Sequence, residues 1–311
     1  LLLREKNKAK DEEIRSAEFS VNLFEEKISD QDKHIQDLQY KNKQSIESKQ
    51  AQIEKEETGQ KQYKEDIKEL EKEINHSGID GVVSVQASQT LKETDILLSH
   101  AEKFDFIKGV VGWLPLSNHD VKSQLEFYSS NNLFKGVRHV VQDEPDNRFI
   151  LGENFNKGIS LLHEFNLIYD ILIYERQLSA SIEFVDQHPN QIFVLDHIAK
   201  PRIKDGMMEP WKSQIYEIAK RENVWCKISG IVTEASWKDW DDSDILPYME
   251  IALEAFGSNR LMFGSDWPVA RLAVEYCAWV DVFREFISRL SKDEQRLIEG
   301  EVATQVYGLN P

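Results

Sequence analysis

Cysteine is nearly absent from this sequence of 311 residues, which contains only Cys226 and Cys277 and no CxxC pair. Two scattered thiols exclude a disulfide-stapled secreted scaffold and are typical of a reducing compartment, so we predict a cytoplasmic location. Basic residues are fewer than acidic ones. The chain has 38 Lys and Arg and 55 Asp and Glu, which gives a formal net charge of −17. This charge disfavours nucleic acid and anionic membrane surfaces as partners.

Long apolar runs are missing too. No stretch approaches the roughly 18 consecutive apolar residues that a spanning helix needs, so the sequence predicts no membrane partner. One alternative stays open at the first residues, where Leu1, Leu2 and Leu3 precede Arg4 and several lysines. The last turn of a spanning helix, followed by its cytoplasmic basic flank, would have the same pattern.

Proline and tryptophan are absent from residues 1–60, although the chain has 8 Pro and 7 Trp. In this segment apolar residues recur at intervals of three and four, among abundant Lys and Glu, as in a heptad seam. The seam positions are Ile14, Ala17, Val21, Phe24, Ile28, Ile35 and Leu38. They predict a helix or short coiled coil over about 14–55, with self-association through residues 10–55. A helix packed on the main domain is the alternative. We therefore divide the chain into residues 1–60 and a barrel domain over residues 61–311.

The rest of the sequence alternates between strand-like and helix-like segments. Seven nearly continuous apolar runs are typical of parallel strands buried on both faces. These runs are Gly81–Ala87, Ile107–Leu116, Phe134–Val141, Leu167–Ile173, Ile192–Ile198, Val224–Gly230 and Leu261–Asp266. Helical patterns lie around them at Tyr63–Ile74, Glu93–Glu102, Phe155–Glu164, Ser179–Gln187, Pro210–Arg221, Ile245–Phe256 and Val274–Leu290. Such repeated units predict an α/β fold, a (β/α)₈ TIM-like barrel whose first strand is unrecognisable.

Polar side chains gather where these strands end. The carboxyl ends of parallel strands meet at one edge, where barrel enzymes build their sites, so these side chains should share one cavity. They are Gln86, Trp113, Arg138, His139, Asp170, Asp196, His197, Lys227, Ser229 and Asp266. An Asp base, an imidazole and cations around one cavity suit the addition of water to a carbonyl. In the alternative interpretation Asp266 caps the next helix and His197 is a buried structural histidine.

Six segments of this region strongly resemble the amidohydrolase-2 group, the branch of the metal-dependent hydrolase superfamily that contains L-fuconolactonase and L-rhamnonolactonase. They are VVSVQAS (82–88), KGVVGWLPL (108–116), KGVRHVVQDEPD (135–146), LDHIAKP (195–201), WCKISGIVTEASW (225–237) and FGSDWPV (263–269). The resemblance covers residues 63–309. It implies a (β/α)₈ barrel, hydrolysis of a lactone or related carbonyl compound and, in some members, a divalent metal.

The resemblance also implies roles for single residues. Asp266 matches the last-strand acid that activates water, and His197 matches the fifth-strand histidine of the metal or substrate site. Arg138 and His139 match residues that face the substrate. Further substrate contacts are expected from Gln86, Trp113, Lys200 and Trp267. The predicted substrate is a sugar lactone such as L-fucono- or L-rhamnonolactone.

One feature of the group is missing from this chain. Its members begin with a strand that carries an Asp-x-His-x-His-like motif and supplies two metal ligands, but nothing before Gly81 resembles it. His34 and His76 are solitary. Only His197 and Asp266 remain as metal ligands, an incomplete set, because a tight zinc site needs three. The cofactor prediction is therefore either one divalent metal, Zn²⁺ or Mn²⁺, or none.

Three explanations of the missing strand stay open. The chain is a fused reading frame, a hydrolase that works without a tightly bound metal, or a catalytically impaired barrel that serves as a scaffold beside a coiled-coil interaction segment. A lactone hydrolase and a non-enzymatic interaction protein are thus both retained. The edges at Gly81–Ala87 and Leu261–Asp266 would be unpaired unless a segment such as Phe19–Phe24 inserts between them.

Overall fold

A computed structural model describes residues 65–310 of the chain. The chain divides into two units, Leu1–Glu69 and Leu70–Pro311. The fold and the site described here belong to the second unit. The predicted helix or coiled coil over 14–55, the self-association through 10–55 and the candidate inserted strand at Phe19–Phe24 all lie outside the described residues.

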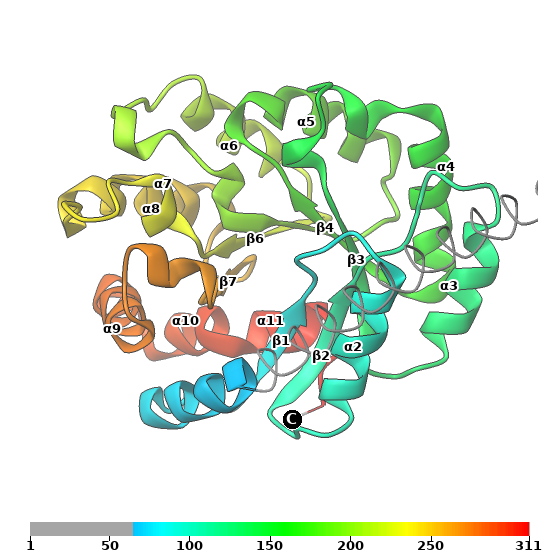
Figure 1. Ribbon diagram of the computed structural model, residues 1–311. Helices are drawn as coiled ribbons and strands as arrows, with labels where there is room; N and C mark the ends of the chain where they lie inside the picture. The colour runs from blue at the N-terminus through cyan, green and yellow to red at the C-terminus, as the bar shows by residue number, and fades with distance from the viewer. Residues whose placement is uncertain (1–64, 311) are drawn as a thin grey trace, which may run out of the picture. The chain divides into compact units, whose positions relative to one another are not determined.

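The second unit is built on one sheet of seven parallel strands, which lie in sequence order (Figure 1). The strands are β1 (Val82–Val85), β2 (Ile107–Gly112), β3 (Phe134–Val140), β4 (Ile168–Leu172), β5 (Phe193–Leu195), β6 (Val224–Ile228) and β7 (Leu261–Phe263). The sheet curls into a half-barrel, and within the described residues β1 and β7 are its two edges. The predicted parallel α/β fold is confirmed, and the curled sheet agrees with a TIM-like fold.

Helices cover the outer face of the curled sheet, and the last of them lie at its open side (Figure 1). They are α2 (Leu91–Ala101), α3 (Val121–Ser129), α4 (Glu153–Leu162), α5 (Leu178–Gln187), α6 (Trp211–Ile218), α7 (Ile231–Glu234), α8 (Asp242–Phe256), α9 (Tyr276–Ile287), α10 (Lys292–Arg296) and α11 (Val302–Val306). Helices α2 to α8 connect successive strands, and α9 to α11 follow β7. A π-helical turn, Leu297–Glu301, joins α10 to α11. Across residues 65–310, every helix is too short or too polar to cross a bilayer.

Side chains alternate between the two faces of each strand, and this alternation separates two cores. On β5, Phe193 packs among the covering helices. The next residue, Val194, packs on the concave face together with Met262 of β7. The same alternation places Asp170 of β4 and Lys227 of β6 on the concave side, where their side chains form an ion pair. Charged groups thus lie inside the half-barrel next to apolar ones.

The C-terminal helices lie at the open side of the sheet, between β7 and β1 (Figure 1). Val302 and Tyr307 are buried in the concave cluster together with Val111 of β2. Lys135 of β3 donates a hydrogen bond of 2.8 Å to the carbonyl oxygen of Gly308. The end of the chain therefore covers apolar strand positions that an open half-barrel would otherwise expose to water.

Candidate active site

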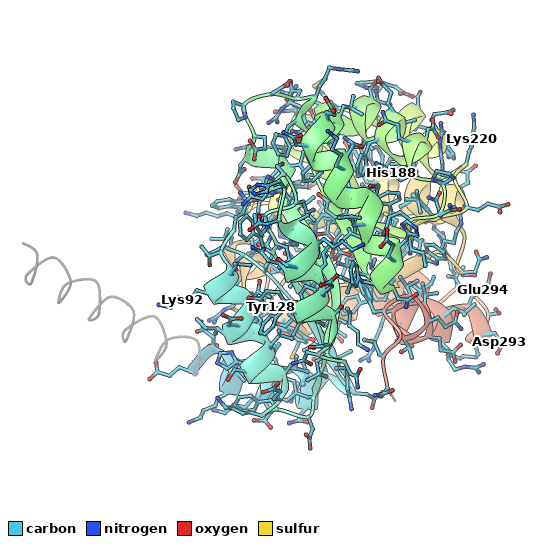
Figure 2. The ribbon with its side chains drawn as sticks, turned by 90° about the vertical axis from the view of Figure 1, so that its right-hand side faces the viewer. Lys92, Tyr128, His188, Lys220, Asp293 and Glu294 are labelled. Carbon is cyan, nitrogen blue, oxygen red and sulfur yellow. The ribbon has the colours of Figure 1, made fainter. Side chains whose placement is uncertain are left out.

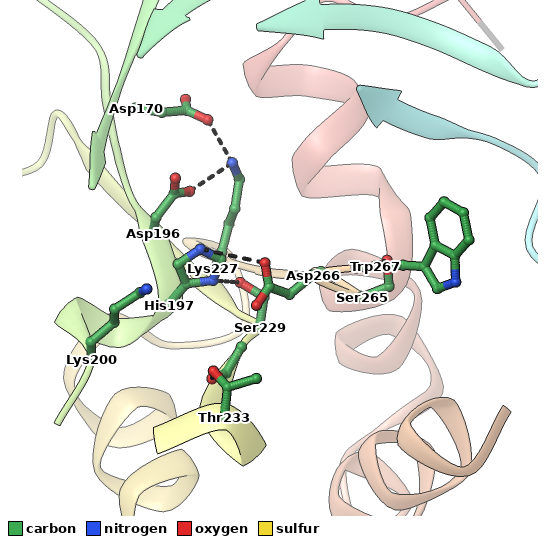
Figure 3. Close-up of polar contacts among 12 residues, drawn as sticks. Asp170, Asp196, His197, Lys200, Lys227, Ser229, Thr233, Ser265, Asp266 and Trp267 are labelled. Atoms are coloured by element: carbon green, nitrogen blue, oxygen red, sulfur yellow. Dashed lines mark hydrogen bonds and ion pairs between the residues drawn. The ribbon is translucent and has the colours of Figure 1, made fainter. Parts of the chain in front are cut away.

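Several strand ends converge at one edge of the sheet (Figure 3). Asp196 and His197 follow β5, Ser229 follows β6 and Asp266 lies beyond the end of β7. The Nε2 atom of His197 lies 3.8 Å from Oδ1 of Asp266. Its Nδ1 atom lies 2.8 Å from the hydroxyl oxygen of Ser229. The imidazole is thus held between a hydroxyl and a carboxylate that come from two other strands.

The imidazole of His197 is buried, with 7% of the residue exposed. Burial lowers the pKa of His197 below its ordinary value of 6.5, although the charges of Asp266 and Asp196 act in the opposite direction. The ring is therefore neutral near pH 7. When Nδ1 donates its proton to Ser229, Nε2 is free to accept a hydrogen bond from water or to bind a cation.

The side chain of Asp266 does not have the capping role that the sequence left open. The helical turn that follows, Val269–Leu272, begins after Pro268 and has no side-chain cap. It is the main-chain carbonyl of Asp266 that accepts a hydrogen bond of 2.9 Å, from the amide of Ala270. The carboxylate is left facing His197, where it can act on a substrate or on water.

Glycine is required at position 230, where these strand ends approach one another. Gly230 has a φ of +61°, and a Cβ atom there would lie 2.8 Å from Oδ2 of Asp266 and 2.8 Å from Nδ1 of His197. Real Cβ atoms essentially never show contacts under 3.0 Å. The absence of a side chain therefore lets the backbone after β6 pass directly beside both polar groups.

The turn that carries His197 has a strained backbone. Four successive residues are left-handed, with φ of 53° at His197, 46° at Ile198, 61° at Ala199 and 49° at Lys200. This conformation costs an L-residue about 1–2 kcal/mol. It persists where the surroundings impose it, and such strain clusters at functional sites. One such restraint is Trp211, whose Nε1 donates a hydrogen bond of 2.7 Å to the carbonyl oxygen of Ile198.

Arg138 and Gln86 are engaged with other groups of the protein. The guanidinium of Arg138 lies 2.8 Å from Oδ2 of Asp196 and also donates to the carbonyl oxygen of Gln86. Gln86 donates back, from Nε2 to the carbonyl oxygen of Arg138, over 3.1 Å. Within residues 65–310, the buried Nε of Arg138 has no hydrogen-bond partner. These two residues tie β1 to β3 and brace Asp196, and their contact with substrate stays a prediction.

His139 and Trp113 form a second polar group at the ends of β2 and β3. Trp113 donates from Nε1 to Nδ1 of His139 over 3.3 Å, and Nε2 of His139 lies 2.7 Å from the carboxylate of Glu144. Phe149 stacks on the imidazole, with ring centroids 4.9 Å apart. Burial lowers the pKa of His139, against the opposing effect of Glu144. The neutral ring therefore carries its proton on Nε2, and both nitrogens are occupied.

Glu234 lies at the same edge, although it does not stand at a strand end in the sequence. Its Oε1 atom lies 3.8 Å from Nζ of Lys200, and that ammonium lies 5.5 Å from the centre of the Tyr174 ring. Burial raises the pKa of Glu234, Lys200 opposes this change and the negative charge of Asp266 adds to it. Two carboxyl groups and one cation thus act on the same space. The one sequence signal for Glu234 was its place in the segment WCKISGIVTEASW.

The structure does not bring Trp267 together with the other predicted site residues. Its indole points away from His197 and Asp266 (Figure 3). It packs instead against the buried side chains of Tyr276 and Val280. The left-handed φ of 52° at Asp266 turns the chain at this point, so that neighbouring side chains diverge.

Among residues 65–310, His197 and Asp266 are the two possible metal donors that face each other at this edge. In the part of the chain that the structure describes, no group of three or more His, Cys, Asp or Glu side chains could hold a metal ion. A tight zinc site has at least three protein ligands. The described donor set therefore does not complete a zinc site.

Comparisons with known proteins identify the family of the chain. The sequence matches the amidohydrolase family model over residues 42–309. The chain belongs to the amidohydrolase family. The resemblance inferred from the six strand-end segments is confirmed, and family membership makes the chain a hydrolase.

Relatives of this amidohydrolase include two L-fucono-1,5-lactonases. L-fucono-1,5-lactonase from Burkholderia ambifaria is 33% identical over 249 residues, which cover 78% of this chain and 84% of that protein. L-fucono-1,5-lactonase from Burkholderia multivorans is 36% identical over 238 residues, covering 73% and 80%. A crystal structure of an amidohydrolase from Burkholderia multivorans with bound zinc has a TM-score of 0.76 and 33% identity, and the match covers 78% of this chain and 88% of that one.

One buried histidine, His197, and two half-buried ones, His139 and His188, predict how the free energy of unfolding depends on pH. Burial lowers the pKa of His139, His188 and His197 below 6.5. At a pH below the pKa that these histidines have in the unfolded chain, the unfolded chain binds more protons than the folded chain. The free energy of unfolding therefore decreases as the pH falls toward the lower pKa values that the histidines have in the folded chain. We expect the free energy of unfolding, measured with urea, to decrease between about pH 7.5 and about pH 5.5. The variant His188→Gln should show a shallower decrease, and equal free energies across this range would contradict the prediction.

Proposed function

We propose that this amidohydrolase hydrolyses a neutral sugar lactone, such as L-fucono-1,5-lactone, to the open hydroxy acid. The observation that carries the proposal is the pair of Asp266 and His197, fixed by Ser229 at the carboxyl edge of the sheet. The two L-fucono-1,5-lactonases that match most of this chain support the substrate class. L-rhamnonolactone is a second candidate of the same chemistry.

In the proposed reaction Asp266 acts as the general base. It takes a proton from water while the water oxygen bonds to the lactone carbonyl carbon, and the carbonyl electrons move to the carbonyl oxygen. His197, neutral and held by Ser229, positions this water through Nε2. Collapse of the tetrahedral intermediate breaks the ring C–O bond, and the proton passes to the departing ring oxygen.

The negative charge that develops on the carbonyl oxygen needs a nearby cation or hydrogen-bond donor. Lys200 is the best candidate, because it lies on the same turn as His197 and its ammonium is held by Glu234 at 3.8 Å. Arg138 has one unpartnered donor, its Nε. His139 and Trp113 line the neighbouring strand ends, but their ring nitrogens are already bonded to each other and to Glu144. Gln86 contributes by holding Arg138 in place.

A divalent metal is compatible with this family, since a relative of known structure contains zinc. In this chain the described residues offer only His197 and Asp266, so no step of the proposed reaction passes through a metal. Zinc or manganese would need further ligands from outside the described residues. The dependence of the rate on added metal is therefore part of the test.

Acid release from a panel of neutral sugar 1,4- and 1,5-lactones tests the proposal. Rates are measured with the full chain after treatment with a chelator, and again after addition of Zn²⁺ or Mn²⁺. We expect turnover of L-fucono-1,5-lactone above the rate without enzyme. The absence of turnover on every lactone and with every metal would overturn the proposal. It would instead favour the catalytically impaired barrel, in which the chain serves as a scaffold.

A further inference from the structure

A continuous row of charged and polar groups crosses the concave interior of the half-barrel. Asp170, Lys227 and Arg138 come from inward positions of β4, β6 and β3, and Asp196 follows β5. The Nζ atom of Lys227 lies 2.5 Å from Asp170 and 2.8 Å from Asp196. Asp196 is also 2.8 Å from Arg138. Two cations and two carboxylates thus alternate in a region from which water is largely excluded.

The row ends at Tyr307, on the C-terminal segment. Its hydroxyl donates to the carboxylate of Asp170, 2.8 Å from Oδ1 and 3.0 Å from Oδ2. Both residues are buried, with 4% of Tyr307 and none of Asp170 exposed. The ring of Tyr307 also lies 5.5 Å from Nζ of Lys227. The proposed reaction uses neither Tyr307 nor Asp170, so their burial inside the sheet has no explanation in that mechanism.

The ionisation of the row favours a fixed arrangement. Burial alone would lower the pKa of Lys227, but Asp170 and Asp196 raise it well above its ordinary value, so the ammonium stays charged. Burial raises the pKa of Tyr307, so its hydroxyl stays protonated and donates. Burial would raise the pKa of Asp196, but Lys227 and Arg138 hold it below its ordinary value. Lys227, Asp196 and Tyr307 therefore each keep one charge state. Burial raises the pKa of Asp170 against the opposing charge of Lys227, and its carboxyl group accepts hydrogen bonds from both Lys227 and Tyr307.

The other end of the row is the strained turn of the site. Asp196 directly precedes His197, the first of the four residues with left-handed φ. Its side chain is tied to Arg138 and Lys227, while Trp211 holds the main chain of the turn at Ile198. A strained backbone relaxes when the contacts that impose it are removed. The orientation of His197 thus depends on how firmly Asp196 is held.

We propose that Tyr307 is a positioning residue, which acts through Asp170, Lys227 and Asp196 to hold the turn that presents His197 to Asp266. The C-terminal segment is thereby coupled to the active site across the interior of the sheet. The measurement of kcat and KM that tests this role rests on the proposed lactone hydrolysis. The order of the turn is measurable without any substrate.

The matched variants Tyr307→Phe and Tyr128→Phe test this role. Each removes one tyrosine hydroxyl that donates 2.8 Å to an aspartate, because Tyr128 bonds to Asp95 in the same way. Tyr128 lies on α3, in the outer layer of helices (Figure 2). Phenylalanine at position 307 keeps the ring beside Lys227 and removes only the hydroxyl. Thermal unfolding of both variants establishes that both are folded.

We expect kcat for L-fucono-1,5-lactone to fall by about 10- to 100-fold in Tyr307→Phe, because a displacement of about 1 Å at a reacting group lowers the rate by up to this factor. KM should change less than about twofold. Tyr128→Phe should retain the parent kcat. Hydrogen–deuterium exchange of the amides of residues 197–200 should become faster in Tyr307→Phe alone.

The positioning role would be overturned if Tyr307→Phe kept both the kcat and the exchange rates of the parent. Equal effects in both variants would also overturn it. If the parent hydrolyses no lactone, the proposed function fails while the exchange measurement still decides the role of Tyr307.

Discussion

Replacing Asp266 with asparagine should lower kcat for L-fucono-1,5-lactone by about 10²–10⁴-fold, the usual loss when a positioned base is removed. Asparagine has nearly the same shape as aspartate but cannot take a proton from water at neutral pH. The carboxylate does not cap the following turn, and its partner His197 lies 3.8 Å away. The substitution therefore removes little that stabilises the fold. Initial rates of acid release and thermal unfolding temperatures measure both effects.

The control for this substitution is Asp293→Asn. Asp293 lies on α10 at the surface, where 83% of its side chain is exposed and where it pairs with Arg296 at 3.1 Å (Figure 2). An exposed pair of this kind contributes little to stability, so this variant should keep the rate and the unfolding temperature of the parent. Equal rates in Asp266→Asn and Asp293→Asn would remove Asp266 from the role of base. A large fall in the unfolding temperature of Asp266→Asn would point to a structural role instead.

The sheet was readable from the sequence because strands buried on both faces leave continuous apolar runs. The predicted run Phe134–Val141 matches β3, which ends at Val140. Ile192–Ile198 was too long, since β5 ends at Leu195 and the following residues enter the left-handed turn. Hydrophobicity does not reveal such a turn, because Ile198 is apolar and buried in either conformation.

Helix α3 was missed for a different reason. It buries only Val121, Leu125 and Tyr128, and Asp120 at its start makes no side-chain cap. Three apolar residues in a polar segment of this length give a weak periodic signal. The helix forms because those three side chains complete the cluster around β2 and β3. Tertiary packing, rather than local preference, determines this element.

The sequence indicated that several polar side chains would meet at the carboxyl edge, but it did not indicate which of them would pair. Strand ends identify which residues reach the carboxyl edge, and His197, Ser229 and Asp266 do meet there. Which groups pair depends on register and on which face each residue occupies. Arg138, expected at the substrate, lies opposite Asp170 in the β3–β4 register and pairs with Asp196. These relations join residues far apart in sequence, and no local pattern encodes them.

Replacing Gly230 with alanine should have the second large effect, a loss of about 100-fold in kcat/KM, together with lower stability. The new Cβ atom would lie 2.8 Å from both Oδ2 of Asp266 and Nδ1 of His197. At least one of these groups must move, and movement of either one changes the geometry of the proposed base and the imidazole. The φ of +61° adds a backbone penalty of about 1–2 kcal/mol for any L side chain.

Gly206→Ala separates these two causes. Gly206 has a φ of +64°, but a Cβ atom there would meet nothing within 4 Å. This variant therefore carries the backbone penalty without a steric conflict, and it should lose stability by a similar amount while keeping the kcat/KM of the parent. Urea unfolding and lactone hydrolysis of the two variants give the comparison. If both lose activity equally, the effect belongs to the backbone strain. If Gly230→Ala keeps the activity of the parent, Asp266 and His197 can be displaced without consequence, and neither of them performs the chemistry assigned here.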